Sequence, residues 1–292
     1  MGPVERLLPR PLKPYAALAR MDRPIGTWLL LWPGLWSLAL AADGLPDARL
    51  CALFALGALL LRSAGCTYND IVDRDFDARV ARTRTRPIPS GAISVRGAVI
   101  FLALLLAGGL AILLQFNAFA IVLGAASLAL VFTYPFMKRI TYWPQAFLGL
   151  TFNWGALLGW AAATGTLGWP ALALYGAGLF WTLGYDTIYA CQDKEDDVLV
   201  GVKSSALALG ERAKPWITVF YGLALIGMGI AGALAGIAWP FWLALAVCGG
   251  HFVWQVATLR LNDAGNCLAR FKANAWTGAI LFAGILAARA WV

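Results

Sequence analysis

The chain has 292 residues, of which 61% are hydrophobic and only 13% are charged. Soluble domains carry about 25% charged residues, so this composition excludes an ordinary soluble globular protein. Apolar runs recur over the whole length with no Gly/Ser-rich or Pro-rich linker between them, which is typical of a polytopic helical membrane protein. We therefore expect a single membrane domain over residues 1–292, with the lipid bilayer as its surroundings and no nucleic-acid partner.

Runs of about 20 apolar residues, the length that crosses a bilayer, define the predicted spans. In chain order they cover 24–42, 47–67, 97–114, 118–135, 144–163, 170–190, 215–235, 240–259 and 274–291. They predict an all-α membrane protein with about nine transmembrane helices in one bundle. Basic residues precede the first run, as in a signal peptide, but Pro33, Gly34 and the tryptophans within it favour a retained span.

The basic residues predict the orientation of the chain. Every lysine and arginine except Arg49 and Arg289 lies in the N-terminal segment or in or beside the second, fourth, sixth and eighth connections. Because cytoplasmic loops are enriched in basic residues, we expect the N-terminus in the cytoplasm and the C-terminus outside. The polar cap of the bundle, with any active site that it carries, then faces the cytoplasm, and we expect the membrane to be a bacterial inner membrane.

The cysteines and the single histidine indicate no separate chemistry. The five cysteines are scattered through apolar segments without a CxxC pair, so neither a disulfide framework nor a zinc site is predicted. Cysteine in such segments usually packs as a small hydrophobic side chain. His251 is also alone in an apolar segment, which favours a satisfied packing role over catalysis.

The stretch "YNDIVDRDFDARVARTRTRPIPSG" at 68–91 concentrates charge at the end of the second predicted span. At about 100° per residue in a helix, Asn69, Asp73 and Asp77 lie within about 80° of one another. Arg62 shares their face, whereas Asp75 points away and is expected to meet water. The helix thus presents carboxylate and amide oxygens in one stripe.

A second cluster, "GYDTIYACQDKEDD" at 184–197, ends the sixth predicted span. The same count brings Asp186, Asp193 and Asp197 to one face within about 40°. Tyr189 lies on the flank of that face, and Glu195 points the opposite way. Like the first cluster, it belongs to the side of the membrane predicted to be cytoplasmic.

Two interpretations of these clusters remain open. Solvated charge at membrane boundaries explains the basic residues, but it explains two stripes of acids poorly. Arg62 and Asp186 also lie within or close to the hydrocarbon region, where ionisable groups are costly and usually functional. Adjacent carboxylates repel unless they are neutralised, and Mg²⁺ typically binds one or two carboxylates together with substrate phosphates.

The arginines after the first cluster complete the chemical pattern. Arg82 and Arg86 follow the acids, and guanidinium groups match phosphate oxygens. Arg84 faces elsewhere if this segment is helical. Carboxylates, a divalent cation and arginines together indicate a diphosphate site, and the apolar bundle implies that the diphosphate carries a lipid tail.

The sequence resembles the UbiA superfamily of intramembrane aromatic prenyltransferases. "NDIVDRDFD" and "DTIYACQDKEDD" match its two aspartate-rich motifs. The blocks "RMDRPIGTWLLLWP", "RTRTRPIPSGAIS", "TYPFMKRITYWPQ" and "GYDTIYACQDKEDDVLVGVKSSALALG" are similar to 4-hydroxybenzoate polyprenyltransferases of ubiquinone biosynthesis. Beyond about residue 215 only the hydropathy agrees with that family.

The resemblance implies the reaction and the roles of the residues. A polyprenyl diphosphate bound with Mg²⁺ ionises at its C1–O bond, and the allylic cation alkylates 4-hydroxybenzoate at the ring carbon beside the phenol. By motif position, the Mg²⁺ ligands are Asn69, Asp73, Asp77, Asp193 and Asp197. The further groups expected around the diphosphate are Asp186, Arg82, Arg86 and a secondary patch of Tyr134, Lys138 and Arg139. For Lys138 and Arg139, a membrane-anchoring role carries equal weight.

The deep Arg62 has two interpretations. Its guanidinium group receives the carboxylate of the aromatic acid or nearby diphosphate oxygens, or it forms a structural pair with Asp186.

Other activities remain as alternatives. A UbiA-type enzyme could act on dihydroxynaphthoate, haem or homogentisate. A membrane transporter with an acidic cytoplasmic vestibule would spread its charges through several spans, and six of the predicted spans have no acidic residue at mid-depth. A CDP-alcohol phosphotransferase would need a DG-x₂-AR spacing that is absent from the sequence.

Overall fold

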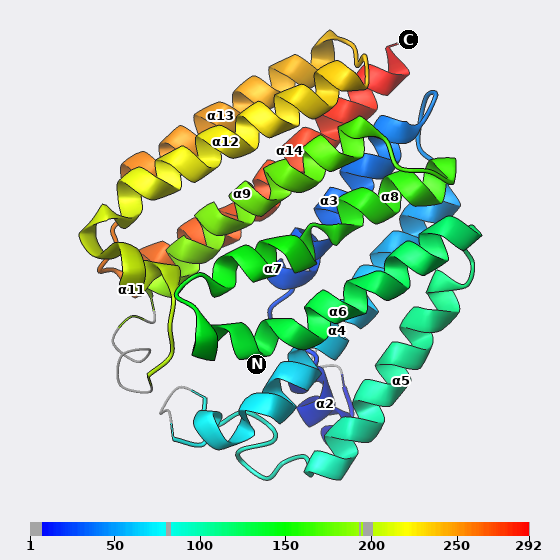
Figure 1. Ribbon diagram of the computed structural model, residues 1–292. Coiled ribbons are helices and arrows are strands. Elements are labelled where there is room, and N and C mark those ends of the chain that lie inside the picture. The colour runs from blue at the N-terminus through cyan, green and yellow to red at the C-terminus, as the bar shows by residue number, and fades with distance from the viewer. Residues whose placement is uncertain (1–7, 80–82, 193, 195–200, 292) are drawn as a thin grey trace. The chain divides into compact units, whose positions relative to one another are not determined.

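The computed structural model describes residues 8–79, 83–192, 194 and 201–291. In these ranges every regular element is a helix, which confirms the predicted all-α class (Figure 1). The elements are η1 (Arg10–Leu12), α2 (Lys13–Leu18), α3 (Ile25–Ala41), α4 (Ala48–Asp77), α5 (Val95–Leu113), α6 (Ala118–Ile140), α7 (Pro144–Phe152), α8 (Trp154–Thr164), α9 (Trp169–Cys191), α11 (Ser205–Leu209), η2 (Gly210–Arg212), α12 (Ala213–Leu234), α13 (Trp239–Thr258) and α14 (Ala264–Ala290).

The helices have the length and composition of a membrane protein. Among the residues that the structure describes, seven helical stretches are long and apolar enough to cross a bilayer. α3, with 17 residues, is shorter, and α9 is not among the seven, although both coincide with predicted spans. The count of nine spans and their orientation therefore stay predictions.

The predicted fifth span is divided at Asn153 into α7 and α8. The buried side chain of Asn153 donates through Nδ2 to the carbonyl of Gly149 and to Oγ1 of Thr182 on α9, both at 2.8 Å. Asparagine side chains compete with helical backbone hydrogen bonds, which explains the interruption. The hydropathy pattern gives no signal of it, because the residues on either side are equally apolar.

By its contacts the chain divides into two compact units. One unit comprises Met1–Trp28 and Ala55–Gln115, and the other comprises Leu29–Phe54 and Phe116–Val292. Two of the three boundaries fall inside the continuous helices α3 and α4, and the third lies in the connection between α5 and α6. The expectation of one domain stays a prediction.

A small apolar core holds the first unit together. Leu18 of α2, Ala98 of α5, and Ile88 and Ile93 of the α4–α5 connection are buried in one cluster. The ring of Tyr15 packs edge-on against Phe101 at 5.2 Å beside this cluster. The connection after the charged stretch is thereby fixed against both α2 and α5.

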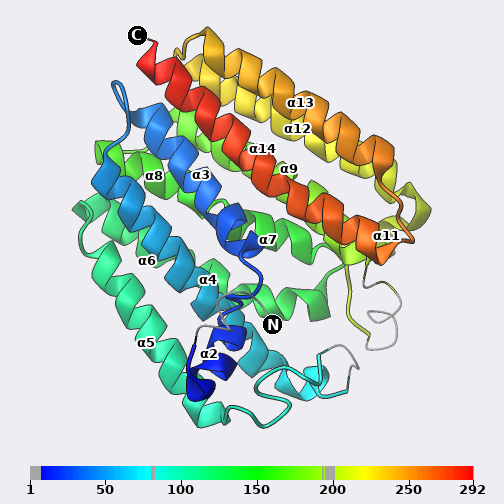
Figure 2. The same ribbon diagram turned by 180° about the vertical axis from the view of Figure 1, so that it is seen from behind.

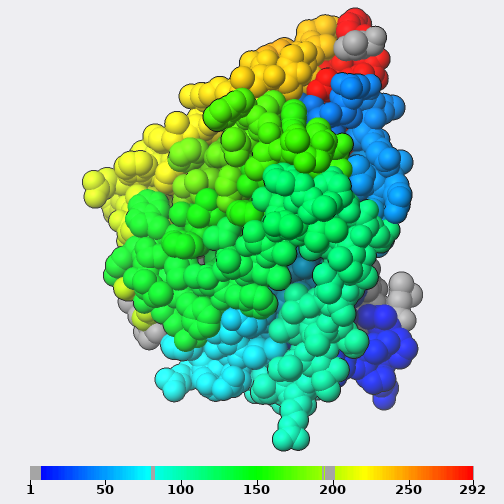
Figure 3. Space-filling model, turned by 45° about the vertical axis from the view of Figure 1, so that its right-hand side comes forward, coloured from blue at the N-terminus to red at the C-terminus, as the bar shows by residue number. Residues whose placement is uncertain are grey.

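α5 forms part of the molecular surface in Figure 3, and several of its apolar side chains are exposed. Ile100, Leu104 and Leu110 are each more than half exposed. Monomeric soluble proteins rarely expose continuous apolar patches of this kind, whereas lipid tails solvate them without penalty. This face indicates contact with the bilayer.

In the second unit, α9 is the central helix. It packs along α12 and also contacts α7, α8 and α14, while α13 lies alongside α12 and α14 (Figure 2). Most residues of α9 are buried, including the large side chains of Trp181, Tyr185 and Ile188. Where α3 meets α8, a Cβ atom on Gly159 would lie 2.5 Å from the carbonyl oxygen of Gly34, so only glycine permits the close approach.

A buried polar network joins the helices of the second unit. Trp181 of α9 donates its Nε1–H to Oδ1 of Asn274 on α14 at 2.8 Å. Nδ2 of Asn274 donates to Oε1 of Gln255 on α13 at 3.0 Å, and the hydroxyl of Tyr221 on α12 donates to the same oxygen at 3.0 Å. These four buried side chains connect four helices. Apolar packing alone does little to select one arrangement of such helices, so the hydrogen bonds help to determine it.

His251 belongs to the edge of this network. Its Nδ1 lies 2.8 Å from Oγ1 of Thr277 and 3.3 Å from Nε2 of Gln255, and its ring stacks on Trp254. These contacts agree with the predicted packing role.

Candidate active site

The first carboxylate cluster occupies the polar end of a helix longer than a bilayer. α4 has 30 residues, which corresponds to about 45 Å at about 1.5 Å per residue. Since the hydrocarbon core is about 30 Å thick, about three turns extend beyond it. Because the apolar residues occupy the first two thirds of α4, the segment from Asn69 to Asp77 is the part that leaves the hydrocarbon.

The acids of this segment divide by burial as the helical count predicts. Asp73 is 1% exposed and Asp77 is 7% exposed. By contrast, the side chain of Asp75 is 74% exposed and forms only a surface pair with Arg74 at 3.6 Å. Asn69 is half-buried. Burying carboxylates is costly unless they are paired, hydrogen-bonded or bound to a metal ion, so the acids on this face need partners.

A chain of ion pairs stabilises this face. Nη2 of Arg20 lies 2.7 Å and 2.8 Å from the two carboxylate oxygens of Asp70, which is completely buried. Nη1 of Arg86 lies 3.2 Å from Oδ1 of Asp70 and 2.7 Å from Oδ2 of Asp77. Arg86, which is predicted to bind diphosphate, is thus placed between two carboxylates.

Arg20 is held rigidly at the end of α2. Its Nη1 donates to the carbonyl of Ala17 at 3.0 Å, and its backbone has a φ of 55°, in the left-handed region that non-glycine residues rarely adopt. Burial lowers the pKa of Arg20, but the combined effects of Asp70, Cys66 and Asp22 raise it by more, so the pKa lies above its ordinary value. The end of α2 is therefore tied to α4 by the ion pair of Arg20 with Asp70.

The connection after α4 determines where Arg86 lies. Thr83 donates its hydroxyl to the carbonyl of Asp77 at 2.9 Å, which folds the chain back onto the helix end. Ile88 and Ile93 then bury their side chains in the core of the unit. Arg86 lies between these two anchors. Arg84 is exposed, but residues 83–91 form turns rather than the helix on which the sequence count for Arg84 depended.

Arg62 lies earlier on α4 and is half-buried. Its Nη1 lies 2.6 Å from Sγ of Cys66, one turn further along the helix. The backbone of Gly26 on α3 is so close that a Cβ atom there would collide with Nε of Arg62. Asp186, its predicted partner under the structural interpretation, belongs to the other unit, so this pairing stays a prediction.

The oxygen donors of the first cluster fit a magnesium ion. In the described part of the chain, no three His, Cys, Asp or Glu side chains converge as a ready-made metal cage. Mg²⁺ does not need one, because it typically uses one or two carboxylates and completes its shell with water and substrate phosphates. The buried Asp73 and Asp77 with the amide of Asn69 supply such a set.

The second motif is only partly described. Asp186 is half-buried near the end of α9. Around it, the ring of Tyr185 packs against Phe271 at 5.8 Å, and Tyr189 packs against the same ring at 4.7 Å. Asp193, Asp197 and Glu195, and Arg82 of the first cluster, lie outside the described residues.

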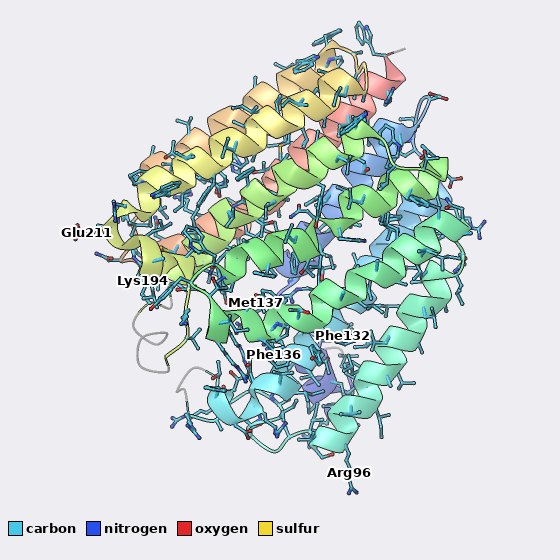
Figure 4. All side chains as sticks on the ribbon, viewed as in Figure 1. Arg96, Phe132, Phe136, Met137, Lys194 and Glu211 are labelled. Atoms are coloured by element: carbon cyan, nitrogen blue, oxygen red, sulfur yellow. The ribbon has the colours of Figure 1, made fainter. Side chains whose placement is uncertain are left out.

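The secondary patch lies at the end of α6. Tyr134 and Lys138 are half-buried, and Arg139 is exposed with its guanidinium carbon 5.8 Å from the ring centre of Phe136. Figure 4 marks Phe132 and Phe136 on this helix. The carbonyl of Lys138 accepts from the backbone N–H of Lys203 at 2.9 Å, which ties α6 to the connection before α11. An anchoring role and a functional role both fit this arrangement.

The sequence reasoning missed Asp70 and Arg20. Asp70 precedes Asp77 by seven residues, so the angular count that defines the stripe brings the two within about 20° of each other. That signal was available. No such signal marks Arg20. Several basic residues precede the first span, and nothing in the sequence distinguishes the one that pairs with Asp70 on α4.

The fold and the site define a class, namely an all-helical membrane protein with buried carboxylates and arginines at the polar end of one span. Residues 30–284 match the UbiA prenyltransferase family, and the chain belongs to this family.

Curated proteins are similar over nearly the whole chain. The mitochondrial 4-hydroxybenzoate polyprenyltransferase of Arabidopsis thaliana is 53% identical over 99% of this chain and 72% of its own length. The enzyme of the same name from Homo sapiens is 49% identical over 97% of this chain and 77% of its own length.

Solved structures share the fold. A UbiA homologue from Aeropyrum pernix K1 has a TM-score of 0.76 and 26% identity, covering 89% of this chain and 97% of its own. A UbiA homologue from Archaeoglobus fulgidus, solved with GPP and Mg²⁺, has a TM-score of 0.66 at 19% identity, covering 96% of this chain and 100% of its own.

Proposed function

We propose that the protein transfers a polyprenyl group from polyprenyl diphosphate to 4-hydroxybenzoate, at the ring carbon ortho to the hydroxyl, in ubiquinone biosynthesis. The observation that carries this proposal is the set of buried carboxylates on α4, neutralised by Arg20 and Arg86 at the polar end of an otherwise apolar helix. Membership of the family and the names of the similar enzymes support the choice of donor and acceptor.

The reaction divides among the residues by their chemistry. The C1–O bond of the donor breaks and the diphosphate takes the electron pair, after which C1 bonds to the ring and the ring loses a proton. Magnesium, when bound, neutralises the diphosphate charge. Its proposed ligands are Asn69, Asp73, Asp77, Asp193 and Asp197. Asp186, Arg82, Arg86, Tyr134, Lys138 and Arg139 are proposed to surround the diphosphate, and Arg62 to receive the acceptor carboxylate or nearby diphosphate oxygens.

One assay tests the proposed reaction. Membranes that contain the protein are incubated with radiolabelled 4-hydroxybenzoate and a series of prenyl diphosphates, with and without Mg²⁺. We expect prenylated 4-hydroxybenzoate only with both substrates and the cation. Dihydroxynaphthoate, homogentisate and haem are supplied in parallel, and turnover of one of these instead would replace the proposed acceptor.

A matched pair of variants tests the carboxylate cluster. Asp73→Asn removes a buried charge with little change in shape, so we expect turnover to be abolished while the protein remains folded. Asp75→Asn removes an exposed charge two residues away, so most activity should remain. If Asp73→Asn turns over like the wild type, α4 does not hold the cation.

We also propose that the basic side of the protein faces the cytoplasm of a bacterium. The positive-inside rule supports the side. The similar enzymes named above are mitochondrial, so the compartment is tested separately by fractionation of the source cells.

A further inference from the structure

Asp70 differs from the other buried acids of α4 in what surrounds it. Both of its oxygens accept from Nη2 of Arg20, and Oδ1 also lies 3.2 Å from Nη1 of Arg86. It is completely buried. A carboxylate enclosed by two guanidinium groups has little capacity left for a metal ion, so Asp70 is not suited to the role proposed for Asp73 and Asp77.

The same Nη1 atom of Arg86 contacts Asp77. It lies 2.7 Å from Oδ2 of Asp77, a shorter distance than to Asp70. Two carboxylates and two guanidinium groups thus form a neutral chain, Arg20–Asp70–Arg86–Asp77. In this chain the positive charge of Arg86 is shared between an acid that binds no cation and an acid proposed to bind one.

We propose that Asp70 is a positioning residue, which holds Arg86 in this shared contact and so keeps Asp77 able to bind magnesium before the diphosphate arrives. The proposal rests on the proposed function in one respect, that Asp77 is a cation ligand. Without the Asp70 carboxylate, the Arg86 charge is directed to Asp77 alone and competes with the cation for its oxygens.

The backbone on both sides prevents Arg86 from moving away instead. Thr83 is hydrogen-bonded to the carbonyl of Asp77, and Ile88 is buried in the core of the unit. Arg86 is therefore confined near the end of α4 whether or not Asp70 carries a charge. Loss of the Asp70 charge therefore changes the electrostatic potential at Asp77 but not the distance over which Arg86 can extend.

The test is a titration of the purified full-length protein with Mn²⁺ alone, followed by electron paramagnetic resonance. We expect Asp70→Asn to weaken Mn²⁺ binding about tenfold, the equivalent of about 1.4 kcal/mol. Arg86→Gln removes the competing charge and should not weaken it. The double variant Asp70→Asn/Arg86→Gln should bind like Arg86→Gln, because neighbouring groups that act through one another are not additive.

Three controls separate positioning from folding. Arg20→Gln breaks the larger ion pair of Asp70 but leaves both Asp70 and Arg86 in place, so it should lower the melting temperature and should not weaken Mn²⁺ binding. Asp75→Asn should change neither. Asp77→Asn should lose the binding, which assigns the ion to this cluster.

Several results would overturn the proposal. These are wild-type affinity in Asp70→Asn, a double variant that binds more weakly than Arg86→Gln, or no saturable Mn²⁺ binding by the wild-type protein. If Asp70→Asn does not fold, the comparison of Mn²⁺ affinity between the neutral double variant and Arg86→Gln still tests the proposal. The prenyl-transfer assay is independent of this titration, so failure of the proposed function shows there and failure of the positioning role shows here.

Discussion

Arg62 is a half-buried charged residue of α4 that lies close to α3. It precedes Asn69 on α4 by about two helical turns, and the backbone of Gly26 lies directly against its guanidinium group. A charge at this depth is expensive and is retained in membrane proteins mostly for function. The contacts with Gly26 and Cys66 restrict the orientation of the planar group, which a receptor for a carboxylate requires.

Two substitutions disturb this group in different ways. Arg62→Lys keeps the charge but loses the two-pronged geometry, so we expect kcat/KM for 4-hydroxybenzoate to fall roughly 10- to 100-fold. Gly26→Ala introduces a methyl group that displaces the same side chain, and it should lower kcat/KM in the same direction while Arg62 is intact.

The measurement is steady-state kinetics with varied 4-hydroxybenzoate, together with a melting curve for each variant. The Mg²⁺ requirement should be unchanged in both. Gly222→Ala is the matched control, because a Cβ atom there meets nothing within 4 Å. A lower melting temperature with unchanged kinetics in both Arg62→Lys and Gly26→Ala would make Arg62 part of the scaffold.

At the level of elements, the features that could be predicted from the sequence are those that follow from helical periodicity. The stripe on α4 could be predicted, because burial of Asp73 and exposure of Asp75 follow directly from the helical repeat. The path of the α4–α5 connection could not be predicted. It depends on where Ile88 and Ile93 find a core, and that core is made by α2 and α5, which no local pattern links to the connection.

The polar network of the second unit shows the same limit. Trp181, Tyr221, Gln255 and Asn274 are distant in sequence, and no local pattern links them to one another. Only the packing of α9 with α12 and α14, and of α13 with both, brings them together. Hydropathy therefore predicts the helices but not the hydrogen bonds that select their arrangement.

Asn274 is the centre of this network, and its removal should loosen the C-terminal helices. Asn274→Ala leaves Nε1 of Trp181 without its acceptor and Oε1 of Gln255 without one donor. We expect a loss of about 1–3 kcal/mol in the free energy of unfolding, the cost of leaving buried polar groups unsatisfied. Unfolding in mixed detergent micelles measures it.

Asn262→Ala is the control for this prediction, because Asn262 is exposed in the connection between α13 and α14. Its stability should be that of the wild type. Double-mutant cycles in membrane proteins give a mean of about 0.6 kcal/mol for interhelical hydrogen bonds. A loss no larger than that for Asn274→Ala would mean that packing, rather than the network, holds α14.

For the whole molecule, the apolar composition and the length of the apolar runs predicted the membrane class and the all-helical fold. The orientation depends on a different property, the distribution of basic residues, since nothing in the helices themselves distinguishes one side of a bilayer from the other. Glu211, in the connection before α12, lies among the residues predicted to be cytoplasmic, and Thr166, between α8 and α9, lies on the opposite side. Both residues are exposed.

Cysteine labelling at these two positions tests the orientation. In a variant without the five native cysteines, Glu211→Cys or Thr166→Cys is expressed in a bacterial inner membrane and exposed to a membrane-impermeant maleimide. With the outer membrane opened and the inner membrane intact, we expect Thr166→Cys to be labelled and Glu211→Cys to be protected until the inner membrane is permeabilised, because the basic connections remain on the cytoplasmic side. The reverse pattern would place the carboxylate cluster of α4 outside the cytoplasm. Labelling of both before permeabilisation would indicate a leaky preparation, which a cytoplasmic marker enzyme detects.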